Sequence, residues 1–216
     1  GRLDLRDRVM ITIDGASSKD LDDAVSLERD GLGRWVLGVH IADVSHYVRP
    51  GSALDLEAWE RGTSVYFADQ VVPMLPRELS NGICSLNPRV DRLALSCVMT
   101  LTPEGEVVDH TIAKSVIRTT ERMTYEDCNA LLAHSDPALA ERYAKILPML
   151  EDMAALSRVL EGRRRRRGAL ELDTRESYVV CDESGTPVDV VLRTPGISEG
   201  LIESFMLAAN ECVAEH

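Results

Sequence analysis

Two stretches of the chain alternate apolar and polar residues around a glycine-containing turn, which is the pattern of a β-hairpin. In the first, residues 22–43, the arms AVSLE and WVLGVHIA flank the turn RDGLGR. In the second, residues 93–117, the chain turns at Pro103-Glu104-Gly105, where proline and glycine favour a tight reversal. The sequence therefore predicts a mixed or antiparallel sheet built on these two hairpins.

Helical patterns are interspersed with further strands. The predicted helical stretches are residues 53–61, a turn within 77–83, a segment capped by Thr124, a segment opened by Asp136-Pro137, residues 149–162 and a terminal segment capped by Ser198. We expect Pro148 to kink or end the helix that Asp136-Pro137 opens. Residues 8–14 and 176–191 have strand character. This mixture predicts an α+β fold in which helices pack against the sheet.

Charge and cysteine content narrow the class of protein. The 216 residues carry a formal charge of −12, whereas a nucleic-acid-binding surface usually shows a basic excess. Carboxylates that hold a cation give the same acidic balance, since the metal reverses the local sign of the charge. Five cysteines without C-x-x-C spacing argue against disulfides and structural zinc, and favour reduced thiols in the cytoplasm. The sequence shows neither a membrane span nor the apolar core of a signal peptide.

The most informative segment is an acidic cluster between two predicted strands. Asp14 ends the first strand, Gly15 permits a sharp turn, and Asp20, Asp22 and Asp23 follow before the next strand begins. Four carboxylates within ten residues repel one another unless a cation lies among them. Hard cations such as Mg²⁺ prefer oxygen ligands and keep waters that a substrate phosphate can displace. Two such ions stabilise both the attacking and the leaving oxygen of an in-line phosphoryl displacement.

Residue types alone leave the role of this cluster open. A solvated acidic surface loop without a ligand is as compatible with the residues as a metal site is. A calcium loop of the EF-hand kind is excluded, because the spacing of Asp14, Asp20 and Asp22 differs and no glutamate falls at its twelfth position.

Three long segments in order give the cluster a context. They are TIDGASSKDLDDAVSL, GVHIADVSHYV and VYFADQVVPMLPRELSNGICSLNP. Together with LIESFMLAANECVA near the end of the chain, they resemble the ribonuclease II/ribonuclease R family and its RNB catalytic domain. The residues of these segments are closer to those of ribonuclease R. The resemblance covers nearly the whole chain, and it implies the N-terminal portion of a longer RNB domain. It implies no OB-fold domain, of the cold-shock or S1 type, within residues 1–216.

The resemblance implies a hydrolytic, processive 3′→5′ exoribonuclease that degrades single-stranded RNA to nucleoside 5′-monophosphates. By motif, Asp14, Asp20, Asp22 and Asp23 are identified as catalytic carboxylates that bind one or two Mg²⁺ ions, with Mn²⁺ as a substitute. Among them Asp22 is implied to be the residue whose loss is most damaging. A monomer in the cytoplasm is expected.

The family also implies residues that contact RNA. Tyr66 matches an aromatic that stacks on the 3′-terminal base, a contact that tolerates any sequence, although core packing is its ordinary alternative. Glu203 matches an acid near the RNA path, and a solvated helix face would look the same. Leu172 stands where the family places a second aromatic clamp; a leucine can pack against a base but offers no π-face for stacking.

Three further features receive structural interpretations. We expect His40 and Asp43, in the H-I-A-D segment, to support the site rather than to bind a ligand. The five-arginine run at residues 163–167 is interpreted as a solvated helix end or loop rather than a phosphate track.

Two other classes of function stay open: a catalytically inactive RNA-binding relative, and a metal-binding module unrelated to RNA.

Overall fold

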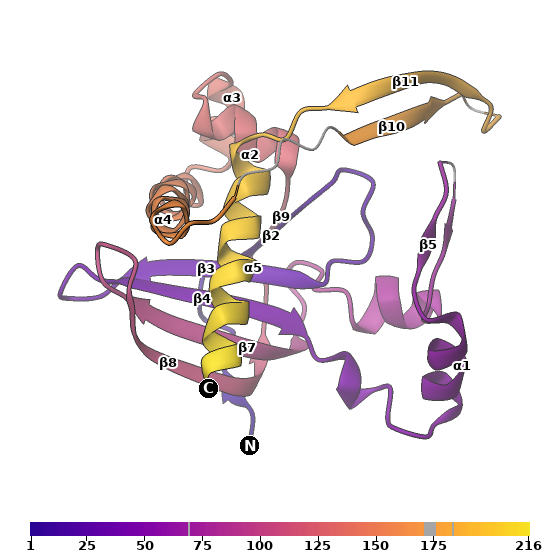
Figure 1. The fold of residues 1–216 in the computed structure, drawn as a ribbon, viewed down its shortest axis with the longest axis horizontal. Helices are drawn as coiled ribbons and strands as arrows, with labels where there is room; N and C mark the ends of the chain where they lie inside the picture. The colour runs from indigo at the N-terminus through magenta and orange to yellow at the C-terminus, as the bar shows by residue number, and fades with distance from the viewer. Residues whose placement is uncertain (69, 171–175, 183) are drawn as a thin grey trace.

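A mixed seven-stranded sheet forms the centre of the molecule. The computed structural model describes residues 1–68, 70–170, 176–182 and 184–216. Within them, the strands of this sheet follow the order β1-β8-β7-β4-β3-β2-β9 (Figure 1). Their bounds are β1 Leu3–Asp4, β2 Ile11–Asp14, β3 Asp23–Arg29, β4 Trp35–Ala42, β7 Arg92–Leu101, β8 Val107–Ile117 and β9 Glu121–Thr124. The predicted α+β class is confirmed.

The two predicted hairpins lie side by side in the middle of this sheet. In the first, β3 pairs antiparallel with β4, placing Ser26 opposite Gly38, and in the second β7 pairs antiparallel with β8. β4 joins the hairpins by pairing with β7. The outer strands were not predicted as sheet edges: β1 runs parallel to β8, and β9 runs parallel to β2.

Five α-helices accompany the sheet. They are α1 Ala53–Arg61, α2 Tyr125–Leu132, α3 Pro137–Arg142, α4 Leu147–Arg166 and α5 Ile197–Glu215, counted over the described residues. The predicted caps of α2 and α3 are confirmed, because Thr124 accepts a hydrogen bond from the Asp127 amide at 3.0 Å and Asp136 accepts one from Leu139 at 3.0 Å.

Two helix boundaries differ from the sequence prediction. Pro148 lies in the first turn of α4 and neither kinks nor ends a helix there, because an amide missing from a first turn breaks no hydrogen bond. The N-cap of α5 is Gly196 rather than Ser198. Ser198 is instead buried in the first turn, where its amide and hydroxyl both donate to Asn129 Oδ1 at 2.9 Å. This contact ties α5 to α2.

The main core lies between one face of the sheet and the helices. Ile11, Val25 and Met99 from strands pack in one buried cluster with Leu150 of α4 and Phe205 of α5. α5 crosses the sheet in Figure 1, and it contacts β4, β7 and β8. A smaller buried cluster covers the other side and includes Met10, Leu21 and Leu86. The described part of the chain contains no helix long and apolar enough to cross a membrane.

Two ribbons extend beyond the sheet. β5 Val65–Tyr66 pairs with β6 Val71–Val72, and β10 Glu176–Cys181 pairs with β11 Pro187–Arg193. Both lie to the right of α5 in Figure 1. Between β6 and β7, residues Glu78–Ile83 form the predicted helical turn, here with π-helical hydrogen bonding.

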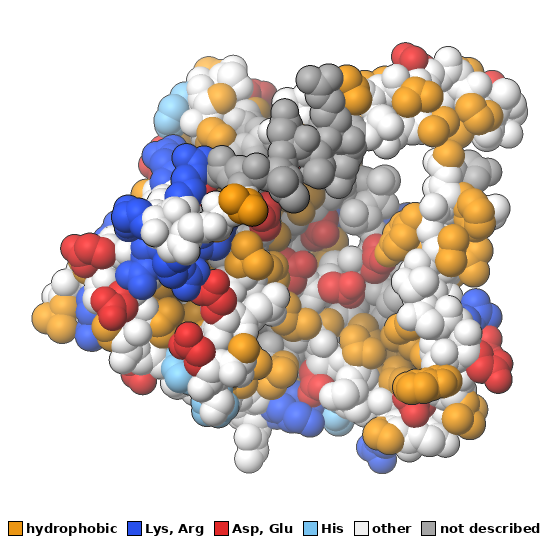
Figure 2. Space-filling view, viewed as in Figure 1, with side chains coloured by type: hydrophobic (Ala, Val, Ile, Leu, Met, Phe, Trp, Pro, Cys, Tyr) orange, Lys and Arg blue, Asp and Glu red, His pale blue; other side chains and the backbone are white. Residues whose placement is uncertain are grey.

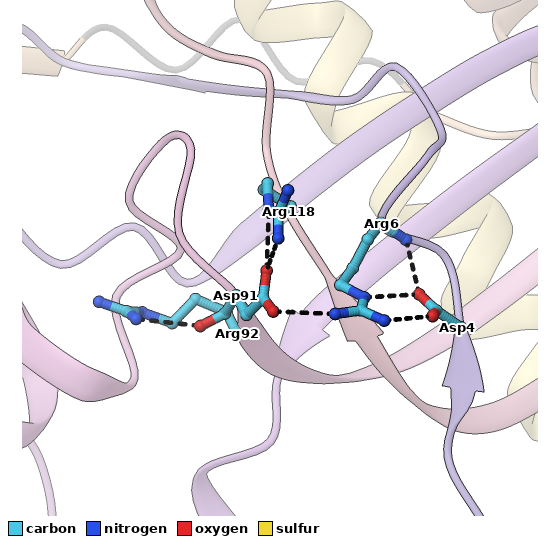
Figure 3. A network of polar contacts seen from close by, with 5 residues as sticks. All are labelled: Asp4, Arg6, Asp91, Arg92 and Arg118. Atoms are coloured by element: carbon cyan, nitrogen blue, oxygen red, sulfur yellow. Dashed lines mark hydrogen bonds and ion pairs between the residues drawn. The ribbon is translucent and has the colours of Figure 1, made fainter.

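An ion-pair network fastens the N-terminal segment to the ends of the second hairpin (Figure 3). Asp91 accepts hydrogen bonds from Arg6 at 3.1 Å and from Arg118 at 2.8 Å, and Arg6 also pairs with Asp4. These groups are largely exposed, so each pair contributes little stability and the network acts mainly as a geometric tie. The adjacent Arg92 points to the segment before β7, where it donates to the Ser85 carbonyl at 2.8 Å.

Candidate active site

The acidic cluster occupies the connection between β2 and β3. Asp14 is the last residue of β2 and Asp23 is the first residue of β3, so antiparallel pairing of these strands brings the two carboxylates to the same end of the sheet. Residues 15–22, named the acid loop here, carry Asp20 and Asp22 between them. The loop rises from the sheet beside α5 in Figure 1.

The four carboxylates interact with one another through their charges. Burial, followed by the charge of Asp23, raises the pKa of Asp14 to about 6. Burial, followed by the charge of Asp22, raises the pKa of Asp23 to about 6. Asp22 is exposed, yet nearby protein displaces part of its hydration, and this effect together with Asp20 raises its pKa. The structure therefore brings all four predicted site aspartates into one electrostatic cluster.

The chemistry of this cluster favours a cation. Asp14 Oδ2 is buried and has no hydrogen-bond partner, which leaves a desolvated acceptor in the centre of negative charge. A cation would satisfy this oxygen and reverse the mutual repulsion that raises the pKa values. Among the described residues, no three Asp, Glu, His or Cys side chains converge closely enough to enclose a metal by themselves. Mg²⁺ suits such an open site, because it usually completes its coordination with water and substrate phosphate.

Two residues from other parts of the chain hold the acid loop. Arg122, on β9, donates through Nη2 to the carbonyl oxygens of Ala16 at 2.9 Å and Ser18 at 2.7 Å. Ser85, which precedes β7, accepts from the Leu21 amide at 3.1 Å and donates to the Lys19 carbonyl at 2.9 Å. Neither residue was predicted, since nothing in the local sequence connects these positions to a loop more than 60 residues earlier.

Tyr66 borders the acid loop. Its hydroxyl donates to Asp20 Oδ2 at 3.3 Å, while 67% of its surface is exposed. It lines a hollow of about 660 Å³ together with Asp20, Ser18 and Phe67. The structure thus places an accessible aromatic ring next to the carboxylates, and the alternative of core packing for Tyr66 is wrong.

Glu203 lies elsewhere, in a groove between α4 and α5. It is exposed, and the groove of about 680 Å³ also contains Arg158, Arg164 and Arg165. Leu172 lies outside the described residues. Figure 2 shows acidic side chains in a hollow in the middle of this face and Lys and Arg side chains grouped over α4.

The run of five arginines, residues 163–167, forms the C-terminal end of α4. The sequence predicted a helix end or a loop at this position. Arg163 to Arg166 make up the last turn, where their positive charge interacts favourably with the partial negative charge of the helix C-terminus. Arg167 caps the helix and pairs with Glu211 of α5 at 2.8 Å, and Arg165 pairs with Glu161 at 2.7 Å.

His40 and Asp43 are scaffold residues, as predicted. His40 is fully buried in β4, where its ring bonds to Ser26 Oγ at 3.1 Å and to Ser96 Oγ at 2.7 Å. Burial lowers the pKa of His40 to about 4, so the ring is neutral at physiological pH. Asp43 is buried in an ion pair with Arg2 and accepts from Ser45 at 2.9 Å.

The family of the chain follows from its match with known proteins. The sequence matches the RNB domain family over residues 2–216. The chain belongs to that family. It is 56% identical over 216 residues to Ribonuclease R 1 of Lactococcus lactis, with 100% of this chain and 26% of the relative covered.

Solved structures agree with this assignment. A structure of Mycoplasma genitalium RNase R in complex with ribose methylated single-stranded RNA has a TM-score of 0.92 and 34% identity, covering 99% of this chain and 33% of that chain. A complex of the same enzyme with double-stranded RNA also has a TM-score of 0.92 and 34% identity, covering 99% of this chain and 37% of that chain. The chain therefore spans between 26% and 37% of the length of these relatives.

Proposed function

We propose that residues 1–216 are the N-terminal portion of the catalytic domain of a metal-dependent 3′→5′ exoribonuclease. The observation that carries this proposal is a cluster of four carboxylates in a chain of the RNB family. The charges of Asp20, Asp22 and Asp23 all act on Asp14. The relatives named ribonuclease R, and RNase R structures that contain RNA, support single-stranded RNA as the substrate. Mg²⁺ is the proposed cofactor and Mn²⁺ a substitute.

Each side chain has a role that its position supports. Asp14, Asp20, Asp22 and Asp23 would hold one or two divalent cations at the ends of β2 and β3. When bound, these cations stabilise negative charge that develops on phosphoryl oxygens during hydrolysis. The exposed ring of Tyr66 is positioned to stack on the 3′-terminal base, and its hydroxyl bond to Asp20 fixes the ring beside the carboxylates. Stacking without base-edge contacts suits an enzyme that degrades any sequence.

Glu203 is assigned to the RNA path. It lines a groove that also contains three arginines, so a nucleic acid backbone in this groove would meet charges of both signs. The role of Glu203 is therefore orientation near the RNA rather than participation in the metal cluster.

The test uses the full-length protein and 5′-labelled single-stranded RNA, with Mg²⁺ or with EDTA. We expect Mg²⁺-dependent shortening from the 3′ end. Asp22→Asn is expected to lower turnover by at least about a thousandfold and to leave the RNA dissociation constant within about twofold, because the change removes charge from the reacting centre rather than from the stacking surface. Asp109→Asn, an exposed carboxylate on β8, is the matched control and should retain full activity.

Three outcomes would separate the alternatives. RNA binding by the wild-type protein without degradation would indicate an inactive RNA-binding relative. Cation binding that RNA does not influence, without RNA binding, would indicate a metal-binding module of another kind. Retained turnover in Asp22→Asn would contradict the role assigned to Asp22.

A further inference from the structure

The acid loop has almost no structure of its own, and its shape is imposed by residues from two distant segments. Within the loop, the Ser18 amide donates to the Gly15 carbonyl at 3.0 Å. Such a loop carries four carboxylates, counting Asp14 and Asp23 at its ends, that repel one another in the absence of a cation. Something outside the loop must therefore keep these charges together.

Arg122 holds the first half of the loop. Its Nη2 converges on three carbonyl oxygens of the loop, those of Gly15 at 3.4 Å, Ala16 at 2.9 Å and Ser18 at 2.7 Å. The guanidinium reaches them because β9 runs parallel to β2, which places Arg122 opposite Thr12, two residues before Asp14. Arg122 Nε is buried without a partner, so the side chain is committed to this position at a cost in desolvation.

The cation of Arg122 also faces the cluster. Its charge acts on Asp14 in the direction opposite to that of the neighbouring aspartates. It is thus a built-in positive charge that partly balances the negative charge of Asp14 before any metal binds. Hydrogen bonds from a charged donor to carbonyl oxygens are stronger than neutral ones, which suits a clamp on a strained charge cluster.

Ser85 holds the second half of the loop. Its hydroxyl is fully buried and makes two bonds, to the Leu21 amide and the Lys19 carbonyl, on either side of Asp20. The Leu86 amide adds a bond to the Leu21 carbonyl at 2.8 Å. Ser85 is fixed in turn by Arg92, whose Nε donates to its carbonyl and which neighbours the network of Figure 3.

We propose that Arg122 and Ser85 are positioning residues, which clamp the backbone of the acid loop from both sides so that its carboxylates stay assembled for cations and RNA. This inference rests on the proposed function. A direct phosphate contact by Arg122 is the competing role; the structure disfavours it, because Nη2 is occupied by three carbonyls and Nε is buried.

The first measurement is amide hydrogen exchange over residues 15–22 in the full-length protein, without metal and without RNA. Arg122→Met and Ser85→Ala should each increase exchange in this loop by about tenfold or more, since each change removes hydrogen bonds that close it. Arg122→Lys keeps the charge but lacks the planar fork, so we expect an intermediate effect. Arg89→Met is the matched control, because Arg89 pairs on the surface with Glu121, next to Arg122, and does not touch the loop.

The second measurement is steady-state RNA degradation over a range of Mg²⁺ concentrations. We expect kcat to fall about 10–100-fold in Arg122→Met and Ser85→Ala, the Mg²⁺ concentration for half-maximal activity to rise, and KM for RNA to stay within about twofold. If Arg122→Met does not fold, Ser85→Ala and Arg122→Lys still test the clamp, because they remove one hydroxyl or keep the cation.

The outcomes distinguish this inference from the proposed function. Unchanged exchange in residues 15–22 in the folded variants would overturn the clamp, whether or not the protein degrades RNA. A rise in KM with kcat unchanged in Arg122→Met would also overturn it and assign Arg122 to RNA contact. An inactive wild-type protein would overturn the proposed function alone, since the exchange measurement requires no substrate.

Discussion

At the level of single residues, the carboxylates Asp14 and Asp23 at the ends of the acid loop destabilise the metal-free fold. Asp14 and Asp23 have pKa values raised from 3.8 to about 6, so the folded state resists their ionisation more than the unfolded chain does. The folded state therefore binds more protons between about pH 4 and pH 6, and stability falls as pH rises through this window. Above it, the full penalty for two charged carboxylates persists until a cation binds.

Asp23→Asn should therefore stabilise the metal-free protein. At pH 8 in EDTA we expect an increase of about 1–3 kcal/mol, because the substitution removes a half-buried charge that the fold disfavours. At pH 4 the advantage should vanish, since Asp23 is then protonated in the folded state. Scanning calorimetry at the two pH values checks this, with Asp109→Asn as the control. An equal effect at both pH values would show that the charge of Asp23 is not the cause.

At the level of elements, strand β4 depends on a position where no side chain fits. Gly38 faces Ser26 on β3, and a Cβ there would lie 2.4 Å from Ser26 Oγ and 2.7 Å from His40 Nε2. The space that glycine leaves is occupied by the His40–Ser26 hydrogen bond. The neutral, buried histidine is thus coupled to the absence of a side chain two residues earlier in its own strand.

Gly38→Ala should destabilise the protein by about 1–3 kcal/mol, through overpacking and loss of the His40–Ser26 bond. Thermal unfolding of the full-length protein measures this. Gly31→Ala is the matched control, because a Cβ at Gly31 meets no atom within 4 Å. Equal stability of the two variants would mean that the strand can shift to admit the methyl group.

Local patterns predicted most elements of this fold but not the contacts between distant ones. The hairpins around residues 30–34 and 103–105 and the caps at Thr124 and Asp136 follow from short-range residue preferences, and the structure confirms them. Short strands such as β1 and β9 carry no periodicity of their own, because their parallel partners are remote in sequence. The Ser198 cap was wrong for a similar reason, since Asn129 of another helix recruits that serine.

The same division applies to the candidate site. The four aspartates and Tyr66 were predicted because they lie in long segments with a recognisable order. Their mutual electrostatic interaction, the orphan oxygen of Asp14 and the clamp by Arg122 emerge only when β9 is placed beside β2. Reactive residues that lie in one segment can be predicted from the sequence. The residues that position them, such as Arg122, lie far away in the sequence and become evident only in the fold.

At the level of the whole molecule, the charge of −12 is not spread evenly. One concentration of negative charge lies at the acid loop, while the arginines of α4 group on the same face (Figure 2). A cation that binds the acid loop in the folded state only will stabilise the entire domain by mass action. A bound cation would therefore offset part of the negative charge of the chain and would also lower the raised pKa values of the site.

Mg²⁺ at one hundred times its dissociation constant should stabilise the protein by about 2.7 kcal/mol at pH 8. Asp14→Asn should abolish most of this gain, because it removes the carboxylate whose buried oxygen lacks a partner. Calorimetric titration with MgCl₂, against NaCl of equal ionic strength, separates site binding from general screening of the acidic chain. Asp109→Asn should keep the full Mg²⁺ response, since Asp109 contributes the same formal charge from an exposed position on β8. Equal stabilisation of both variants would mean that Mg²⁺ acts on the net charge of the surface, and the acid loop would then lose its assignment as the metal site.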